Sequence, residues 1–340
     1  MQMNSHGGAS ARPERRQRLR ARVIGSIVCG AIILAGGLCA AAQDYPTHPI
    51  RVITTSSPGG TSDIFMRALG EALQKRLGQP FIVEARPGGS FNIGARVCAE
   101  APPDGYTICI IPAEPLVYNQ YLFKTLNFDP ASLEPITQLF AIDSILVVNR
   151  DLKARTLKEL SERSKAQPAT LGYSTGAVPL GVLMETIRKD YDIDIVRVPF
   201  RGGGEAIAAL LSGSIPVGFY GIANVRSLIE AGNVVGLMTD SLKRSPLFPD
   251  IPTVAEVLGT TFDPPNYFAL LAPGGTPKAV ITRLYTETEA IMADPEFQRR
   301  QLIERGLRPI ASSPEAFAAS MVKDRQAARQ IVEEAGLTPQ

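Results

Sequence analysis

The stretch Thr55-Ser-Ser-Pro-Gly-Gly-Thr-Ser-Asp63 joins an apolar run to a segment with helical periodicity. The run before it, Ile50–Thr54, has the β-branched alternation of a strand. The glycine pair therefore falls at a strand-to-helix turn, the unit from which α/β folds are built. The apolar residues after the turn recur at roughly helical spacing: Ile64, Met66, Leu69, Leu73 and Leu77.

Two interpretations of this turn are open. Gly59 and Gly60 can adopt backbone angles closed to other residues, which lets a ligand approach the main chain. Thr61 or Ser62 is the expected N-cap, and the free N–H groups of the first turn point outward at the positive end of the helix dipole. Such a turn binds a carboxylate or phosphate without Lys or Arg. The alternative is a tight turn with a cap and no ligand.

Residues 1–42 have the three parts of a secretory signal peptide. Six arginines between Arg12 and Arg22 form a basic region, an apolar stretch follows, and Ala40-Ala-Ala42 supplies a small-residue cleavage site. We expect cleavage after Ala42 and a periplasmic mature protein. A membrane anchor is the competing interpretation, but the apolar stretch is short and no second span follows. The pair Arg15-Arg16 leaves twin-arginine export open beside the general route.

The mature chain is nearly neutral. Without the six arginines and one glutamate of residues 1–42, the 35 basic and 33 acidic residues fall to 29 and 32, a net charge of −3. This balance argues against a nucleic acid or an anionic membrane surface as partner. Cys98 and Cys109 remain after cleavage. They could form a disulfide in an oxidising compartment, but both fall in apolar segments, and two buried thiols are the favoured expectation.

The strand–turn–helix pattern repeats along the first part of the chain. After the first unit come a strand over 81–84, the turn Arg86-Pro-Gly-Gly-Ser90, a helix over 92–101 capped by Ser90, and a strand over 107–111. Strands that alternate with helices predict a parallel sheet, in which turns at the carboxyl ends of strands gather along one edge. Both Gly-Gly turns are therefore expected to face the same crevice.

A second α/β series begins after a strand predicted over 144–149. Four further strands are expected with helices between them, and a strand over 266–272 and two helical segments then close the chain. The simplest layout has a first domain made of residues 43–145 and 265–340, with a second domain, 146–264, inserted. Two crossings between the domains make a hinge, and a cleft lies between them.

Gly172-Tyr-Ser-Thr-Gly176 matches G-x-S-x-G, the nucleophile elbow of serine hydrolases. The chain has two histidines, His6 in the signal and His48, so none follows Ser174 to act as a general base. Anion binding is a better role, because hydroxyls and backbone N–H groups lie where a strand gives way to a helix. A loop without a ligand is the structural alternative.

Other motifs argue against metal and cofactor sites. Asp190, Asp192 and Asp194 alternate as at the start of a calcium loop, but Ile195 stands where that loop needs Gly. One mature His and two separated Cys offer almost no ligands for zinc. Gly202-Gly-Gly204 lacks the dinucleotide spacing, and no Walker lysine is present. We expect no metal and no cofactor, and nothing marks out a catalytic carboxylate pair.

Together the motifs resemble the extracytoplasmic solute receptors of the tripartite tricarboxylate transporters, the Bug proteins. The matching pieces span the mature chain in the order of that family, which makes the resemblance far more specific than any single motif. They are Tyr45-Pro-Thr-His-Pro-Ile50, Ser57-Pro-Gly-Gly-Thr-Ser-Asp63, Leu77-Gly-Gln-Pro80, Glu84-Ala-Arg-Pro-Gly-Gly89, Pro103-Asp-Gly-Tyr-Thr107, Val198-Pro-Phe-Arg-Gly202, Pro249-Asp-Ile-Pro-Thr253 with Glu256, and Ala272-Pro-Gly-Gly-Thr-Pro277.

The resemblance implies an α/β, two-domain, periplasmic-binding-protein-like fold of type II, with the ligand in a cleft between the domains. It also implies that backbone N–H groups, hydroxyls and ordered water hold the carboxylate of the ligand, largely without a salt bridge. Carried over to this sequence, the ligand-binding residues are Ser57, Gly59, Gly60, Thr61, Asp63, Ser90, Ser174, Thr175, Gly176, Phe200 and Gly202.

Departures from the family pattern bear on the ligand. Ser56 and Ser57 replace an aromatic residue or Pro, and Phe200-Arg201 replaces Tyr-Lys, which removes one hydroxyl. Tyr220 stands where the family often places Asp. Because an Asp facing the pocket would suit an amino group, its replacement makes an amino-acid ligand less expected.

The expected function is therefore that of a non-enzymatic, monomeric periplasmic receptor. It captures a small organic acid and presents it to a membrane permease of a tripartite tricarboxylate transporter. The alternatives are an orphan receptor of the same fold that signals to a sensor kinase and, more remotely, a secreted hydrolase that uses Ser174. The sequence does not name the acid.

Overall fold

The computed structural model describes residues 45–166, 171–175, 177–200 and 203–339. The described helices and strands all belong to one unit, His48–Gln340. The predicted signal peptide, residues 1–42, lies outside the described residues, so its cleavage stays a prediction.

The first sheet is built from strands on both sides of the middle of the chain. Its strands are β1 (Ile50–Thr54), β2 (Phe81–Ala85), β3 (Thr107–Pro112), β4 (Leu133–Ile142), β10 (Tyr267–Pro273) and β11 (Leu307–Pro309). They lie in the order β11-β4-β10-β3-β1-β2. β1 is parallel to β2 and β3, whereas β10 is antiparallel to β3 and β4, and β11 is antiparallel to β4.

The second sheet comes from the middle of the chain. Its strands are β5 (Ser144–Asn149), β6 (Gly172–Thr175), β7 (Val196–Arg197), β8 (Val217–Gly221) and β9 (Val234–Thr239). They lie in the order β7-β6-β8-β5-β9. β6 is parallel to β7 and β8, and β5 is antiparallel to β8 and β9.

The parallel pairing predicted for β1, β2 and β3 is confirmed, but each sheet as a whole is mixed, because other strands join it antiparallel. One of these strands, β4, was not predicted from the sequence. It pairs antiparallel with β10 and β11, and after Asp143 the chain continues into β5, which pairs antiparallel with β8 and β9 in the second sheet. β4 escapes detection because its buried positions do not alternate and its pairing with β10 shifts register twice.

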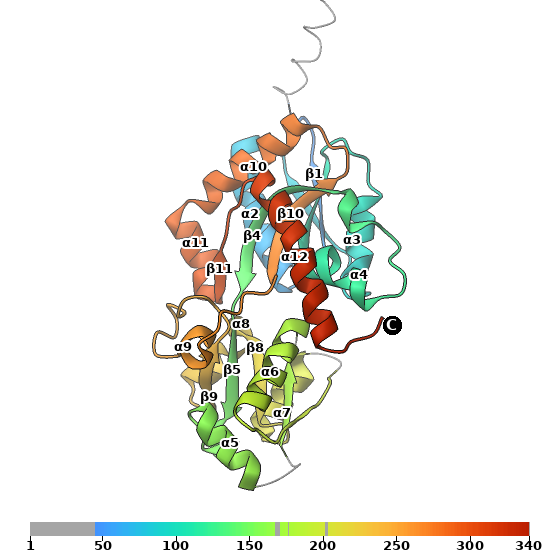
Figure 1. Cartoon of the computed structure of the whole chain (residues 1–340). Helices are drawn as coiled ribbons and strands as arrows, with labels where there is room; N and C mark the ends of the chain where they lie inside the picture. Colours follow the sequence, from blue (N-terminus) through green and yellow to red (C-terminus); the bar gives the residue numbers. More distant parts are fainter. Residues whose placement is uncertain (1–44, 167–170, 176, 201–202, 340) are drawn as a thin grey trace, which may run out of the picture. The chain divides into compact units, whose positions relative to one another are not determined.

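Helices pack on each sheet (Figure 1). α2, α3, α10 and α12 contact strands of the first sheet, and α6, α7, α8 and α9 contact strands of the second. The helices are α2 (Thr61–Leu77), α3 (Asn92–Ala99), α4 (Asn119–Leu122), α5 (Leu157–Ala166), α6 (Val178–Asp190), α7 (Gly203–Ser212), α8 (Ile222–Glu230), α9 (Val254–Leu258), α10 (Lys278–Met292), α11 (Pro295–Gln301) and α12 (Pro314–Glu334), with short helical turns η1 (Glu114–Tyr118), η2 (Pro130–Ser132), η3 (Arg150–Leu152) and η4 (Ile303–Arg305).

The apolar stripe predicted after the opening turn forms one face of α2. Met66, Leu69 and Leu73 are fully buried, as their spacing predicts. Ile64, which the pattern also included, is 39% exposed. The spacing therefore identifies the buried face of this helix but not the residue at its edge.

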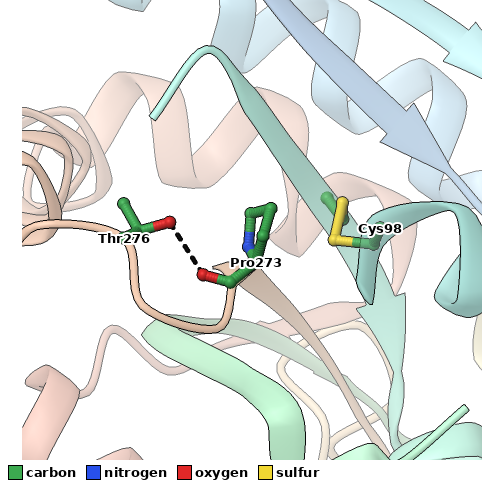
Figure 2. Close-up of a disulfide and its surroundings, with 4 residues drawn as sticks. Cys98, Pro273 and Thr276 are labelled. Carbon is green, nitrogen blue, oxygen red and sulfur yellow. Dashed lines mark hydrogen bonds between the residues drawn. A yellow bond between two sulfur atoms is a disulfide. The ribbon is translucent and has the colours of Figure 1, made fainter. Parts of the chain in front are cut away.

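Cys98 and Cys109 form a disulfide, so the favoured expectation of two buried thiols is wrong. Cys98 lies on α3 and Cys109 on β3, their Cα atoms are 6.1 Å apart, and both side chains are fully buried. Figure 2 shows this bond together with the turn after β10, where the Thr276 hydroxyl donates to the Pro273 carbonyl at 2.7 Å. The disulfide ties α3 to the sheet it covers.

The strands of the second sheet, β5 to β9, are consecutive in the chain, and β10 returns the chain to the first sheet. The predicted domain boundaries, 43–145 with 265–340 and 146–264, stay a prediction about independent units. Among the described residues, no helix is long and apolar enough to cross a membrane.

Candidate functional site

The turn between β1 and α2 is held by its own polar side chains. The Ser62 hydroxyl lies 2.7 Å from the Thr54 hydroxyl and donates to the Ser56 hydroxyl at 2.7 Å. The N-cap of α2 is Gly60, without a side-chain cap bond, so the prediction of Thr61 or Ser62 is wrong. Ser62 cannot be the N-cap because it already lies within α2, and its hydroxyl is hydrogen-bonded to Thr54 at the end of β1.

Asp63 has partners within the same turn. Its carboxylate pairs with Arg67 at 2.9 Å and accepts the N–H of Gly59 at 3.0 Å. Burial raises the pKa of Asp63, but the hydrogen bonds from Arg67 and Gly59 and the positive charge of Arg67 outweigh it, so the pKa lies below its usual value. The geometry gives Asp63 a structural role in shaping the turn.

The second Gly-Gly turn leads into α3. Four successive residues, Gly88 to Phe91, have positive φ. The N-cap of α3 is Phe91, so the predicted cap at Ser90 is wrong: with φ of 52°, Ser90 lies in the left-handed region rather than in the extended conformation of a cap. Its carbonyl instead accepts the amide of Asn119 at 2.9 Å, which fixes the turn against α4.

A cavity of about 370 Å³, here called the Ser174 cavity, lies at the carboxyl ends of β6 and β8. Ser174 is the last but one residue of β6, and Tyr220 is the last but one of β8. Their hydroxyls hydrogen-bond to each other. Both residues are buried, and Thr175 and Phe200 line the same cavity. Burial raises the pKa of Tyr220, although the bond with Ser174 lowers it, so the phenol is neutral and able to donate.

Loops of the first sheet complete the Ser174 cavity. Glu114, in η1 after β3, and Asn266, before β10, line it together with Ser144 and Asn224. Among the described lining residues there is no Lys, Arg or His. Burial raises the pKa of the Glu114 carboxyl. The polar groups that face a ligand here are therefore hydroxyls, amides and one carboxyl.

Other predicted site residues line two further cavities. A cavity of about 410 Å³, the Ser90 cavity, is lined by Ser90 and shares Glu114, Ala177 and Asn266 with the Ser174 cavity. A third, of about 280 Å³, the Gly59 cavity, is lined by Gly59 and Thr61. The two Gly-Gly turns follow adjacent parallel strands, β1 and β2, but Gly59 and Ser90 line different cavities, and the prediction that both turns face one crevice stays a prediction.

Some of the predicted site residues are thus divided among three cavities, and the others line none of them or lie outside the described residues. Ser174, Thr175 and Phe200 share one cavity, and Ser90 lines the cavity beside it. Gly59 and Thr61 line the third, while Ser57, Gly60 and Asp63 line none of these three cavities. Gly176 and Gly202 lie outside the described residues. As no ligand is present, the binding role of each residue stays a prediction.

The sequence analysis missed Glu114, Asn224 and Asn266, and it treated Tyr220 only as a departure from the family pattern. A signal for Glu114 was present: Ala113-Glu-Pro115 directly follows the buried strand β3, and ligands of open α/β sheets bind outside the carboxyl ends of strands. Asn266 carried no such signal, because it precedes its strand.

The Ser174 hydroxyl is hydrogen-bonded to a phenol rather than to the imidazole of a general base. The hydroxyl has Tyr220 as its partner, and His48 stacks on Tyr106 with ring centres 3.5 Å apart. The described part of the chain contains no group of three His, Cys, Asp or Glu side chains arranged to hold a metal ion. The site has the features of a binding site, with hydrogen-bond donors around a cavity of a size typical for small molecules.

Comparisons with known proteins agree with the fold. Residues 65–337, more than half of the chain, match the tripartite tricarboxylate transporter family receptor. The protein BugT of Bordetella pertussis is 28% identical over 319 residues, which cover 91% of this chain and 96% of BugT.

Solved structures of similar proteins superpose on most of this chain. The periplasmic binding protein BugD superposes with a TM-score of 0.73 at 26% identity, covering 87% of this chain and all of BugD. The R. palustris protein Rpa4515, solved with adipate, gives 0.77 at 25% identity, with 87% and 100% coverage. The predicted fold class, a periplasmic-binding-protein-like α/β fold, is confirmed. The chain belongs to the tripartite tricarboxylate transporter receptor family, the family of the periplasmic Bug solute-binding proteins.

Proposed function

We propose that the mature chain binds a small organic acid in the Ser174 cavity and delivers it to the permease subunits of a tripartite tricarboxylate transporter. The observation that carries this proposal is the hydroxyl pair of Ser174 and Tyr220 in a cavity whose described lining has no basic side chain. Neutral donors hold a carboxylate firmly enough for capture and loosely enough for release.

The energetics are compatible with a transport receptor. Hydrogen bonds from neutral groups to a charged carboxylate contribute roughly 1.5–3 kcal/mol each before ordering costs, so a few of them supply micromolar affinity. Side chains of the lining that can donate include the hydroxyls of Ser174 and Tyr220 and the amides of Asn224 and Asn266. The R. palustris relative was solved with adipate, a dicarboxylate, which supports the same ligand class.

The cavity also supports coupling between ligand and conformation. Ser174 and Tyr220 come from the second sheet, whereas Glu114 and Asn266 come from loops of the first. A ligand that touches both sets favours the conformation in which both are close. With the proposed domains at 43–145 plus 265–340 and at 146–264, this is hinge closure, and closure is the signal that a permease would recognise.

The disulfide supports export. Structural disulfides persist in oxidising compartments such as the periplasm, and Cys98–Cys109 is buried against the first sheet. We propose that residues 1–42 direct export and are removed, and that the mature protein acts without enzymatic turnover or cofactor, as a monomer.

A thermal-shift screen of the mature chain against di- and tricarboxylates, aromatic acids and amino acids tests the proposal. We expect one group of acids to raise the melting temperature, and a Ser174→Leu variant to lose that shift. Ser227→Leu is the matched control, because Ser227 is exposed on α8 and away from the cavity lining. No shift with any acid, or an equal shift in Ser174→Leu, would contradict the proposal.

Delivery to a permease needs its own measurement. Transport of the stabilising acid should depend on this chain when it is produced together with cognate permease subunits in a host that lacks them. Capture of a sensor-kinase domain by the ligand-bound chain, without transport, would instead favour a signalling receptor.

A further inference from the structure

Glu114 lies where two cavities meet. It lines both the Ser174 cavity, about 370 Å³, and the Ser90 cavity, about 410 Å³. It follows β3 in the turn η1, so its position comes from the first sheet, opposite the hydroxyl pair of the second sheet. A ligand bound at Ser174 and extending toward the neighbouring cavity passes Glu114.

The Glu114 carboxyl has no side-chain hydrogen-bond or ion-pair partner among the described residues, and burial raises its pKa. Arg197 also lines the Ser90 cavity, but no ion pair joins it to Glu114. Its guanidinium lies beside Gly181, with the central carbon 3.7 Å from the position that a Cβ on Gly181 would take. Buried carboxylates in proteins are normally paired. Glu114, which is partly buried, has no such counter-ion among the described residues.

A second polar group nearby is also unpartnered. The Tyr118 hydroxyl lines the Ser90 cavity on a residue that is 2% exposed, and it has no hydrogen-bond partner in the described part of the chain. Burial, and then the negative charges of Glu114 and Asp324, raise the pKa of Tyr118, so it stays neutral. The Glu114 carboxyl and the Tyr118 phenol thus both line the Ser90 cavity, and neither has a side-chain partner among the described residues.

We propose that Glu114 is a specificity-determining residue of this receptor: it accepts a hydrogen bond from a protonated amino group on the bound acid, whose carboxylate lies at Ser174 and Tyr220. This inference rests on the proposed function. It reverses the expectation drawn from Tyr220 alone, because the carboxyl that suits an amino group is supplied by the first sheet.

A ligand amine supplies what the site lacks. A cation beside the carboxyl offsets the desolvation that burial imposes on its charged form and restores ionisation. A second ligand carboxylate at the same place would require a proton between two like charges. Ionisable groups lining the two cavities are Glu114, Tyr118, Tyr220 and Arg197, and the tyrosines stay protonated. Glu114 is therefore the group whose ionisation a bound amine shifts.

Calorimetric titration of the mature chain with matched acids tests this. The pairs are glutamate with glutarate, aspartate with succinate, and 4-aminobutyrate with butyrate. We expect at least one amino member to bind about tenfold more tightly than its partner, and Glu114→Gln to remove that advantage, because a neutral amide no longer pairs with the cation. Affinity for the amino member should rise as the pH rises through the raised pKa of Glu114 and the carboxyl ionises.

Glu162→Gln, at an exposed position on α5, is the matched control and should change no affinity. Equal or tighter binding of the plain acids, a Glu114→Gln variant that keeps the amino preference, or affinity that falls as pH rises would overturn the inference while leaving the receptor function intact. Binding of no acid from either set would overturn both.

Discussion

The hydroxyls of Ser174 and Tyr220 hydrogen-bond to each other across two adjacent parallel strands. Ser174 is in register with Gly218, and Tyr220 lies two residues further along the same strand face. The pair holds the donors of the Ser174 cavity in place before a ligand arrives. Preorganised donors bind a carboxylate without a further ordering cost.

Tyr220→Phe should weaken binding of the stabilising acid about tenfold and lower the free energy of unfolding by about 1–2 kcal/mol, because Ser174 loses its buried partner. Calorimetric titration and urea denaturation measure the two effects. Tyr285→Phe is the control, since the Tyr285 hydroxyl donates to Glu289 on an exposed helix face. Unchanged acid binding in Tyr220→Phe would show that the Tyr220 hydroxyl does not contact the ligand.

Gly218→Ala should distort the Ser174 cavity by displacing the ring of Tyr220. A Cβ at this position would come within 2.7 Å of Cζ and 2.9 Å of the hydroxyl of Tyr220, so the ring must move. Overpacking of this kind costs about 1–3 kcal/mol, and we expect a loss of acid binding with it. In Gly204→Ala, the control on α7, the new Cβ meets nothing within 4 Å, and stability should be unchanged or slightly higher.

Asp63→Asn should lower stability more than affinity, in contrast to the sequence prediction that Asp63 contacts the ligand. Its carboxylate already serves Arg67 and Gly59, and the expected loss is about 1–2 kcal/mol, reduced because Arg67 is half exposed. Since the folded-state pKa of Asp63 lies below its usual value, this stability is present above about pH 4 and is lost as the pH falls. Urea denaturation across that range should show a smaller acid dependence in the variant.

Loss of acid binding in Asp63→Asn with unchanged stability would instead return Asp63 to the ligand site. Glu296→Gln, which breaks an exposed pair with Arg299 on α11, should alter neither quantity and serves as the control.

Removal of the disulfide should destabilise the first sheet. Cys98 and Cys109 are 11 residues apart, and loss of such a cross-link costs about 2–4 kcal/mol. Reductant should lower the melting temperature of the mature chain, and a Cys98→Ala, Cys109→Ala double variant should start lower and be insensitive to reductant. A wild-type melting temperature that reductant leaves unchanged would mean that the bond contributes nothing to stability.

Asp240 should make stability fall as pH rises. It is buried, accepts the N–H of Ser144 at 2.6 Å and lies near Asp143, and burial raises its pKa to about 8. Because the unfolded chain releases this proton near 4, the contribution of Asp240 to stability is fully present below that pH and is lost as the pH rises toward about 8. Asp240→Asn keeps the acceptor oxygen and should flatten the decrease, measured as melting temperature against pH. An identical decrease in the variant would assign it to other carboxyls.

Local patterns predicted the strands well where burial alternates or is continuous. β1 and β9 have the predicted bounds, and β3 extends one residue beyond the prediction. Sheet pairing was not predictable from the same patterns, because β4 mixes Glu, Pro, Thr and Gln with its apolar residues and bulges against β10. Without β4 the chain looks like a series of parallel βαβ units.

The site was predictable to the extent that it lies at strand ends with small polar residues. Ser174, Thr175 and Phe200 were named from sequence and share one cavity. Glu114 was missed, because a single carboxyl after a strand has no spacing pattern to mark it. The caps at Gly60 and Phe91 were mispredicted because neighbouring hydroxyls bond elsewhere and because the backbone turns through positive φ.

A crystal structure of the mature chain with the acid that most raises its melting temperature tests the central claim most directly. The claim predicts a carboxylate of the ligand within hydrogen-bond distance of the Ser174 and Tyr220 hydroxyls, with the ligand enclosed by loops that include Glu114 and Asn266. A ligand bound in the Gly59 cavity, or on the surface with the Ser174 cavity still holding only water, would contradict it.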